Sequence, residues 1–155
     1  MKLSTAFVTA LFSASALAAP AADAADVVER QNGAISMMAA VPQWTIENMK
    51  RVCNKANTQC TWTFAIDTHT AAATPCKFVV KGASASTTDS SNNKCGGYTI
   101  GSGWSGQFGP GNGFTTLSVV SNAKKLIIYP AYTDKQLAGG KVVKPDQSYT
   151  PQNLP

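Results

Sequence analysis

The segment CTWTFAID, residues 60–67, carries the clearest signal of the fold class. Its apolar side chains recur at every second position and are separated by polar or small residues. The apolar positions are Cys60, Trp62, Phe64 and Ile66. Successive side chains of a strand point to opposite faces, whereas one helical face recurs every three or four residues. Aromatic residues and threonine also favour strands. We therefore predict an antiparallel strand with one face in the core.

Similar short segments follow along the chain. Alternation continues in residues 76–81, and short strand-like runs occupy residues 98–100, 114–120 and 125–129. A four-residue turn, Ser121–Lys124, separates the last two runs and makes the strongest hairpin signal. Many short strands with regular turns are typical of β-sandwiches and small barrels. We therefore predict an all-β fold, a small antiparallel β-sandwich or barrel stapled by two disulfides, with at most one or two short helices.

Three segments are less regular. Residues 41–52 suit an extended segment with a short helical excursion. Residues 82–94 contain no apolar residue larger than alanine, which predicts a polar surface loop. Residues 133–138 are the one place where an amphipathic helix longer than about two turns is considered, with Thr133 or Asp134 as its cap.

The N-terminus predicts export. Lys2 precedes the uncharged apolar stretch 3–17, and Ala16-Leu17-Ala18 fits the small-x-small cleavage rule of a secretory signal peptide. The stretch is shorter than the roughly 20 residues that span a bilayer, so we expect no integral membrane segment. The predicted organisation is a signal peptide over residues 1–18, a flexible leader or pro-segment over 19–41, and a single β-rich domain over 42–155.

The charge balance excludes one class of partner. The chain has 13 basic and 8 acidic residues, a formal net charge of +5. Most lysines are scattered singly, and aromatic residues do not alternate with them as they do in nucleic-acid-binding surfaces. We therefore predict no nucleic-acid partner.

The four cysteines predict two disulfides, because an even count in an exported chain indicates oxidative pairing. Three pairings are possible, and we favour Cys53–Cys60 with Cys76–Cys95. The hexapeptide NKANTQ between the first two is polar and turn-like, so it would bring its ends together. Zinc is not expected, because the spacing is not C-x-x-C and His69 is the only histidine.

The stretch GSGWSGQFGPGNGF, residues 101–114, matches the dinucleotide pattern G-x-G-x-x-G in its first six positions. That pattern binds a cofactor only where a helix follows the glycines. Here more glycines and Pro110 follow, so no cofactor is predicted. We interpret the glycines as turn and bulge positions that fold Trp104, Phe108 and Phe114 onto the sheet. The alternative is a loop that presents Trp104 or Phe108 to a partner.

Catalytic signals are weak. Asp67-x-His69 lies at a strand end, where the carboxylate would orient the imidazole, but no serine lies in a nucleophile elbow. The scattered carboxylates include none in an apolar setting that would raise its pKa for glycosidase chemistry. We predict a protein that is not an enzyme. The alternatives are a wall-carbohydrate-binding module that uses Trp62 and Trp104 with exposed tyrosines, and a small hydrolase that uses Asp67 and His69.

The C-terminal stretch from Tyr129 contains further candidate contacts. Tyrosine offers a large contact area at low entropic cost. The structural alternative is that Tyr129 and Tyr132 pack over the edge of a sheet. The candidate partner-binding residues are Trp104, Phe108, Tyr129, Tyr132, Asp134 and Lys135.

Three motifs in the second half carry a family resemblance: GWSGQFG (103–109), NGFTT (112–116) and YPAYTDKQL (129–137). They resemble the necrosis-inducing secreted protein family of plant-pathogenic fungi, which includes hypersensitive-response-inducing elicitors of cereal pathogens. The resemblance runs from Cys53 to Pro155, and its four-cysteine pattern is present.

The resemblance implies a small, non-catalytic effector that acts in plant tissue and provokes cell death or defence. Its implied partners are plant host proteins, an immune co-receptor kinase and a receptor-like cytoplasmic kinase. It implies action in the host apoplast or, after uptake, in the host cytoplasm, and we expect a monomer. The resemblance carries over no catalytic residue.

Overall fold

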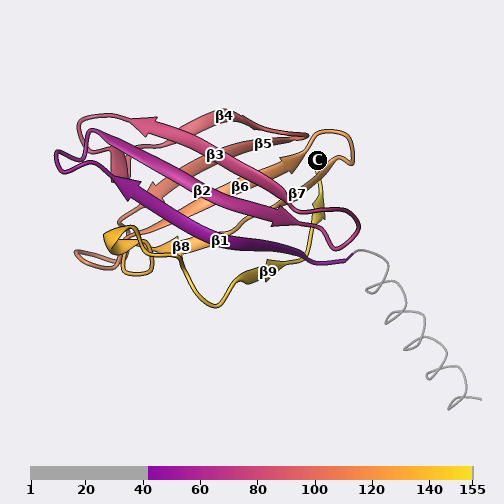
Figure 1. The fold of residues 1–155 in the computed structure, drawn as a ribbon. Helices are drawn as coiled ribbons and strands as arrows, with labels where there is room; N and C mark the ends of the chain where they lie inside the picture. The colour runs from indigo at the N-terminus through magenta and orange to yellow at the C-terminus, as the bar shows by residue number, and fades with distance from the viewer. Residues whose placement is uncertain (1–41, 155) are drawn as a thin grey trace, which may run out of the picture. The chain divides into compact units, whose positions relative to one another are not determined.

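The computed structural model describes residues 42–154, so the predicted signal peptide and leader lie outside the described residues. In the described range the chain forms two antiparallel sheets (Figure 1). The four-stranded sheet has the order β3 (Thr74–Lys81), β2 (Gln59–Asp67), β1 (Trp44–Cys53), β9 (Gln147–Tyr149). The six-stranded sheet has the order β10 (Gln152–Asn153), β7 (Leu126–Ile128), β6 (Phe114–Ser121), β5 (Tyr98–Ser105), β4 (Ser90–Cys95), and β8 (Ala131–Thr133) also pairs with β6.

The core lies between the two sheets, because each presents one apolar face to the other. In β2 the residues Cys60, Trp62, Phe64 and Ile66 are all buried, as their alternation predicts. Leu117 and Val119 of β6 are fully buried in the same cluster. Trp44 of β1 meets Tyr98 of β5 edge to face, with ring centroids 5.7 Å apart. Aromatic contacts therefore join the sheets through the core.

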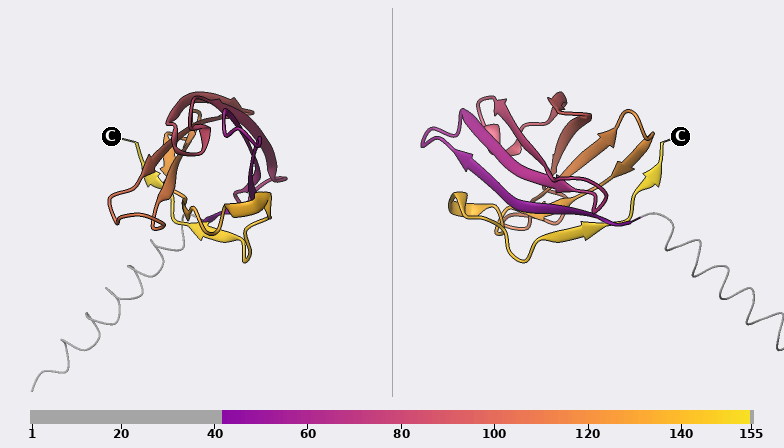
Figure 2. Two further views of the ribbon diagram at one scale, coloured as in Figure 1. Left: turned by 90° about the vertical axis from the view of Figure 1, so that its left-hand side faces the viewer. Right: turned by 45° about the vertical axis from the view of Figure 1, so that its right-hand side comes forward.

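Both lateral edges of the pair of sheets are closed. On one side the Cys76–Cys95 disulfide links β3 to β4, the edge strands of the two sheets. On the other side the chain passes from β9 on the four-stranded sheet to β10 on the six-stranded sheet. Figure 2 shows the sheets curving towards each other when viewed along the strands. The predicted all-β sandwich or barrel is confirmed.

Both predicted disulfides are present. Cys53 and Cys60 are register partners in the β1–β2 hairpin, with Cα atoms 3.9 Å apart. The polar hexapeptide between them forms the turn, where Asn54 N–H donates to the Gln59 carbonyl at 2.9 Å. Cys76 and Cys95 have Cα atoms 5.3 Å apart. Cys53–Cys60 therefore links the two strands of one hairpin, and Cys76–Cys95 links the edge strands of the two sheets.

Four local expectations need correction. The predicted helical excursion in residues 41–52 is a β-bulge, where the register shifts between Glu47 and Lys50. Residues 133–138 end β8 and turn, with one Leu137 N–H to Thr133 carbonyl bond of 3.2 Å, before the 3-10 helix η2 (Ala138–Gly140).

The other two corrections concern polar segments. The predicted loop 82–94 contains the 3-10 helix η1 (Ala85–Thr87) and most of β4. Gly101 and Gly103, predicted as turn or bulge positions, lie inside β5 and pair with Ser118 and Thr116 of β6. Glycine has weak strand propensity, but β5 forms at these residues because it pairs with β4 on one side and β6 on the other.

Candidate functional site

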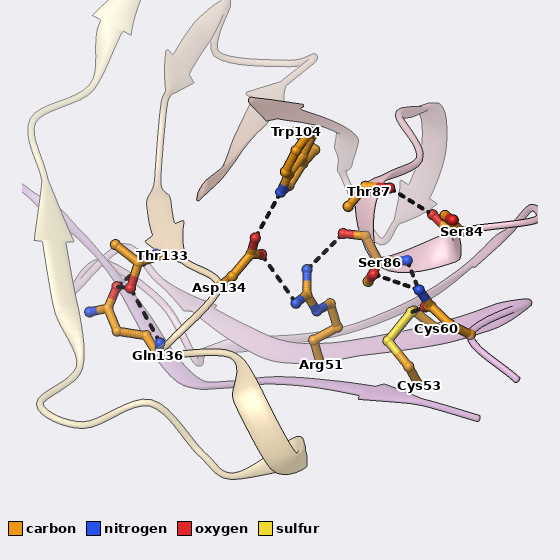
Figure 3. Close-up of polar contacts among 11 residues, drawn as sticks. Arg51, Cys53, Cys60, Ser84, Ser86, Thr87, Trp104, Thr133, Asp134 and Gln136 are labelled. Atoms are coloured by element: carbon orange, nitrogen blue, oxygen red, sulfur yellow. Dashed lines mark hydrogen bonds and ion pairs between the residues drawn. A yellow bond between two sulfur atoms is a disulfide. The ribbon is translucent and has the colours of Figure 1, made fainter. Parts of the chain in front are cut away.

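Trp104 lies near the end of β5, where two hydrogen bonds fix it. Its backbone N–H donates to Asp89 Oδ1 at 2.8 Å. Its indole Nε1–H donates to Asp134 Oδ2 at 2.9 Å, from the segment that follows β8 (Figure 3). Trp104 and Asp134, which the sequence predicts separately as partner contacts, therefore contact each other.

Arg51 completes this cluster from the four-stranded sheet. Its Nη2 lies 3.3 Å from Asp134 Oδ1, and its Nη1 donates to the Ser86 carbonyl at 2.9 Å. The guanidinium carbon lies 5.4 Å from the centroid of the Trp62 ring, within the range of a cation–π contact. The Arg51 side chain is 7% exposed and that of Asp134 is 32% exposed. We call Arg51, Trp104 and Asp134 the anchor cluster.

Glycine lets the chain lie against this cluster. A Cβ atom on Gly113 would overlap the Asp134 carboxylate and lie 2.8 Å from the Trp104 ring. The Gly113 carbonyl in turn accepts the Asp134 backbone N–H at 2.9 Å. The start of β6 and the end of β8 are thus fixed at the anchor cluster.

The loop between β5 and β6 is built from two turns. The Gly109 N–H donates to the Gly106 carbonyl at 3.0 Å, and the Asn112 N–H donates to the Gly109 carbonyl at 3.2 Å. The Asn112 side-chain amide also donates to the Phe108 carbonyl at 3.2 Å. These bonds connect the residues of the loop to one another beside β8.

A shallow apolar groove lies beside this loop. The Phe108 side chain is 65% exposed, and its ring stacks on that of Phe114 with centroids 5.7 Å apart. The groove has a volume of about 260 Å³. Its lining residues are Phe108, Asn112, Phe114, Ala131, Tyr132 and Thr133. We call it the Phe108 groove. Aromatic residues are enriched at protein interfaces, so this ring and the hollow beside it are a candidate contact surface.

The structure places Tyr129 and Lys135, two further candidate partner contacts, outside the Phe108 groove. Tyr129 is 51% exposed but lines a different groove, with Thr116 and Ser118. Lys135 is exposed next to the anchor cluster.

Tyr132 is 1% exposed, so the prediction that its ring is offered to a partner needs correction. Its inward position in β8 points the ring into the core. Burial and the neighbouring Tyr149 raise the pKa of its phenol well above the ordinary value. The position of a tyrosine in a strand decides its exposure, and the sequence does not show which face β8 buries.

Trp62 is also placed inside. It is 2% exposed and stacks on Phe78, with centroids 5.8 Å apart. It therefore offers no ring face on which a sugar could stack, which removes one of the residues behind the carbohydrate-binding alternative.

Asp67 and His69 do form a pair, with Oδ2 and Nδ1 3.1 Å apart. The structure adds a partner that sequence reasoning missed, because Thr45 Oγ1 lies 2.8 Å from His69 Nε2. Within residues 42–154, no three His, Cys, Asp or Glu side chains gather in a group that could hold a metal ion. In the same part of the chain, no helix is long and apolar enough to cross a membrane.

Comparison with known proteins assigns the chain to a family. The sequence profile of the family Effector TSP1 matches residues 45–154, which include the whole anchor cluster and the Phe108 groove. The chain belongs to the Effector TSP1 family. A curated Effector TSP1 from the fungus Hypocrea virens (strain Gv29-8 / FGSC 10586) is 64% identical over 121 residues, which cover 77% of this chain and 82% of that protein.

Membership of the Effector TSP1 family confirms the resemblance to a secreted fungal effector and elicitor group. The two disulfides and the effector family are both consistent with secretion.

Proposed function

We propose that this chain is a secreted effector that acts in plant tissue by binding host immune proteins and thereby provokes defence responses or cell death. The target class is a receptor-associated kinase, either an immune co-receptor kinase or a receptor-like cytoplasmic kinase. Membership of an effector family supports action on a host. The single observation that carries a binding mechanism is the Phe108 groove, where a 65% exposed phenylalanine is stacked on a second ring.

The groove has the properties of a binding site that loses little entropy on association. Its floor belongs to β6 and β8, which the anchor cluster holds together through Asp134. Large apolar side chains in held positions dominate the free energy of many protein interfaces, and preorganisation lowers the cost of binding. From residue 31 onward the chain has 11 basic and 5 acidic residues, a net +6, which favours approach to acidic surfaces.

The test is binding of the purified chain to purified kinase domains of both classes. Phe108→Ser should weaken binding about tenfold or more, because it removes the exposed anchor ring. The matched control is Val79→Ser, which removes an exposed apolar side chain (40% exposed) from β3 of the four-stranded sheet. Infiltration of the same three proteins into leaves, scored for cell death and immune signalling, should give the same order of effect.

Two results would contradict the proposal in different ways. If the wild-type chain binds neither kinase class and leaves show no response, host-kinase targeting is wrong. If both variants bind like wild type, the partner uses another surface than the Phe108 groove.

The place of action is tested separately. We propose action in the apoplast after export directed by residues 1–18. Expression in leaf cells with these residues should give a response, and expression without them should give none. A response only to the form without residues 1–18 would place the target in the host cytoplasm.

A further inference from the structure

We propose that Asp67, His69 and Thr45 form a hydroxyl-nucleophile site that transfers acyl groups from small activated carboxylic esters to water. Thr45 Oγ1 is the nucleophile, His69 is the general base, and Asp67 is a positioning residue. The site is independent of host binding, since it lies on residues that take no part in the Phe108 groove.

The geometry follows the order carboxylate, imidazole, hydroxyl. Asp67 ends β2, and its two carboxylate oxygens both hold His69. Oδ1 accepts the His69 backbone N–H at 2.7 Å, and Oδ2 lies 3.1 Å from Nδ1. On the opposite side of the ring, Nε2 lies 2.8 Å from Oγ1 of Thr45 in β1. Both ring contacts fall in the range that defines a nucleophile–base–orienter arrangement.

The proton positions follow from the donors and acceptors. A carboxylate only accepts, so Nδ1 must carry the proton of the neutral ring. Nε2 is then the acceptor, and the Thr45 hydroxyl donates to it. Ser148 Oγ of β9 lies 2.8 Å from Thr45 Oγ1. Because the Thr45 proton is directed to Nε2, Ser148 is the donor in this contact. Thr45 Oγ1 is therefore aligned to give its proton to His69.

Backbone conformation and exposure support a reactive position. His69 has φ +57°, a left-handed conformation that residues with side chains seldom adopt, and the Asp67 bond to its N–H holds it there. Its side chain is 51% exposed, so a small ester can reach the Thr45–His69 pair from solvent.

The reaction is balanced without any cofactor. Thr45 Oγ1 attacks the acyl carbon while its proton passes to His69 Nε2. The bond to the leaving alcohol breaks, and His69 returns the proton to that oxygen. Water then adds to the acyl-threonine, His69 takes and returns a proton again, and the carboxylic acid leaves. A positioned general base contributes about 10²- to 10⁴-fold, so we expect slow turnover of activated esters.

The experiment measures p-nitrophenyl acetate hydrolysis by the full exported chain. A lone exposed imidazole also hydrolyses this ester, and His69 is the only histidine, so the hydroxyl must be tested directly. Thr45→Val keeps the branched shape without the hydroxyl and should lower kcat/KM about tenfold or more, whereas Thr45→Ser should retain the activity. Thr61→Val, at another outward position of the same sheet, is the matched control and should leave the rate unchanged.

Two further readouts separate the roles. Mass spectrometry of the quenched reaction should find an acetyl group on the peptide that contains Thr45. Asp67→Asn should lower kcat with little change in KM, because it affects the orientation of the imidazole and not ester binding. The proposal is overturned if Thr45→Val hydrolyses the ester like wild type, or if no acetyl group reaches Thr45.

Discussion

At the scale of single residues, burial decides what each predicted contact can do. Trp104 and Asp134 fit the composition of a binding surface, but in the fold their polar groups bind each other and Arg51. Arg51 is the most buried member of this anchor cluster and lies over the Trp62 ring. The cluster therefore holds a surface in place, and Phe108 is the residue that the surface exposes.

We expect the two charged residues of the anchor cluster to differ in how much their loss costs in stability. Asp134→Ala should lower the free energy of unfolding by about 2–3 kcal/mol, because it leaves the buried Arg51 charge without a carboxylate and the Trp104 indole N–H without its acceptor. Arg51→Met should cost less, about 1–2 kcal/mol, because Asp134 is partly solvated and keeps its bond to Trp104. Urea unfolding measures both, with Lys135→Ala as a surface control expected within about 0.5 kcal/mol of wild type. Equal costs for the two variants would contradict this account.

Gly113 makes a steric prediction. Gly113→Ala should destabilise the domain by about 1–3 kcal/mol, because the added Cβ would overlap the Asp134 carboxylate and lie 2.8 Å from the Trp104 ring. Thermal unfolding followed by tryptophan fluorescence should show both the loss and a changed Trp104 environment. Gly97→Ala is the control, since no neighbouring atom lies within 4 Å of the position that its added methyl group would take. Similar melting temperatures for the two variants would show that close packing of Gly113 against Asp134 and Trp104 does not matter.

At the scale of elements, edge strands depend on contacts from elsewhere. β9 has three residues and pairs only at the start of β1. The chain just before it is held by Asp146, whose Oδ1 accepts the Asn48 backbone N–H at 2.9 Å at the β1 bulge. The Lys144 amine binds the same carboxylate at 3.0 Å. The bulge that deforms β1 thus also provides the N–H that fixes the C-terminal segment.

This contact predicts a pH dependence. The Asn48 N–H first, and Lys144 second, lower the pKa of Asp146 below its ordinary value of 3.8. A lowered folded-state pKa gives a stabilisation that is complete above the ordinary pKa and is lost as pH falls through the lowered one. Asp146→Ala should therefore be less stable than wild type at about pH 5, with the difference shrinking towards about pH 2. Urea unfolding of both proteins across this range checks it, and a constant difference would exclude the carboxylate as its source.

At the scale of the whole domain, stability depends on closing two sheets into one body. The core side chains come from both sheets, so separation of the edges would expose them to water. The Cys76–Cys95 bond closes one edge and the β9–β10 crossing closes the other.

The two disulfides should differ in their effect. Cys76→Ser with Cys95→Ser opens a loop of about 20 residues and should cost about 3.3 kcal/mol, or about 10 °C or more in Tm. Cys53→Ser with Cys60→Ser opens a shorter loop and should cost about 2.5 kcal/mol. Calorimetry of the two double variants measures the order. A larger loss for the hairpin pair would contradict the role of Cys76–Cys95 in closing the edge.

The sequence alone determined the strands that have an apolar face. Residues 60–67 and 76–81 alternate because one face must leave water, and that requirement is visible in the order of side chains. The turn-like hexapeptide between Cys53 and Cys60 likewise favoured their pairing, because it brings its own ends together.

Other features became visible only in the fold, because they depend on how strands pair and which face each strand buries. β4 contains almost no apolar residue and forms because β5 pairs with it. The burial of Tyr132 depends on which face β8 turns inward, and the contact of Thr45 with His69 depends on the pairing of β1 with β2. Strand pairing and the choice of buried face depend on the neighbouring strands as well as on the segment itself, so the residues of one short polar segment do not specify them.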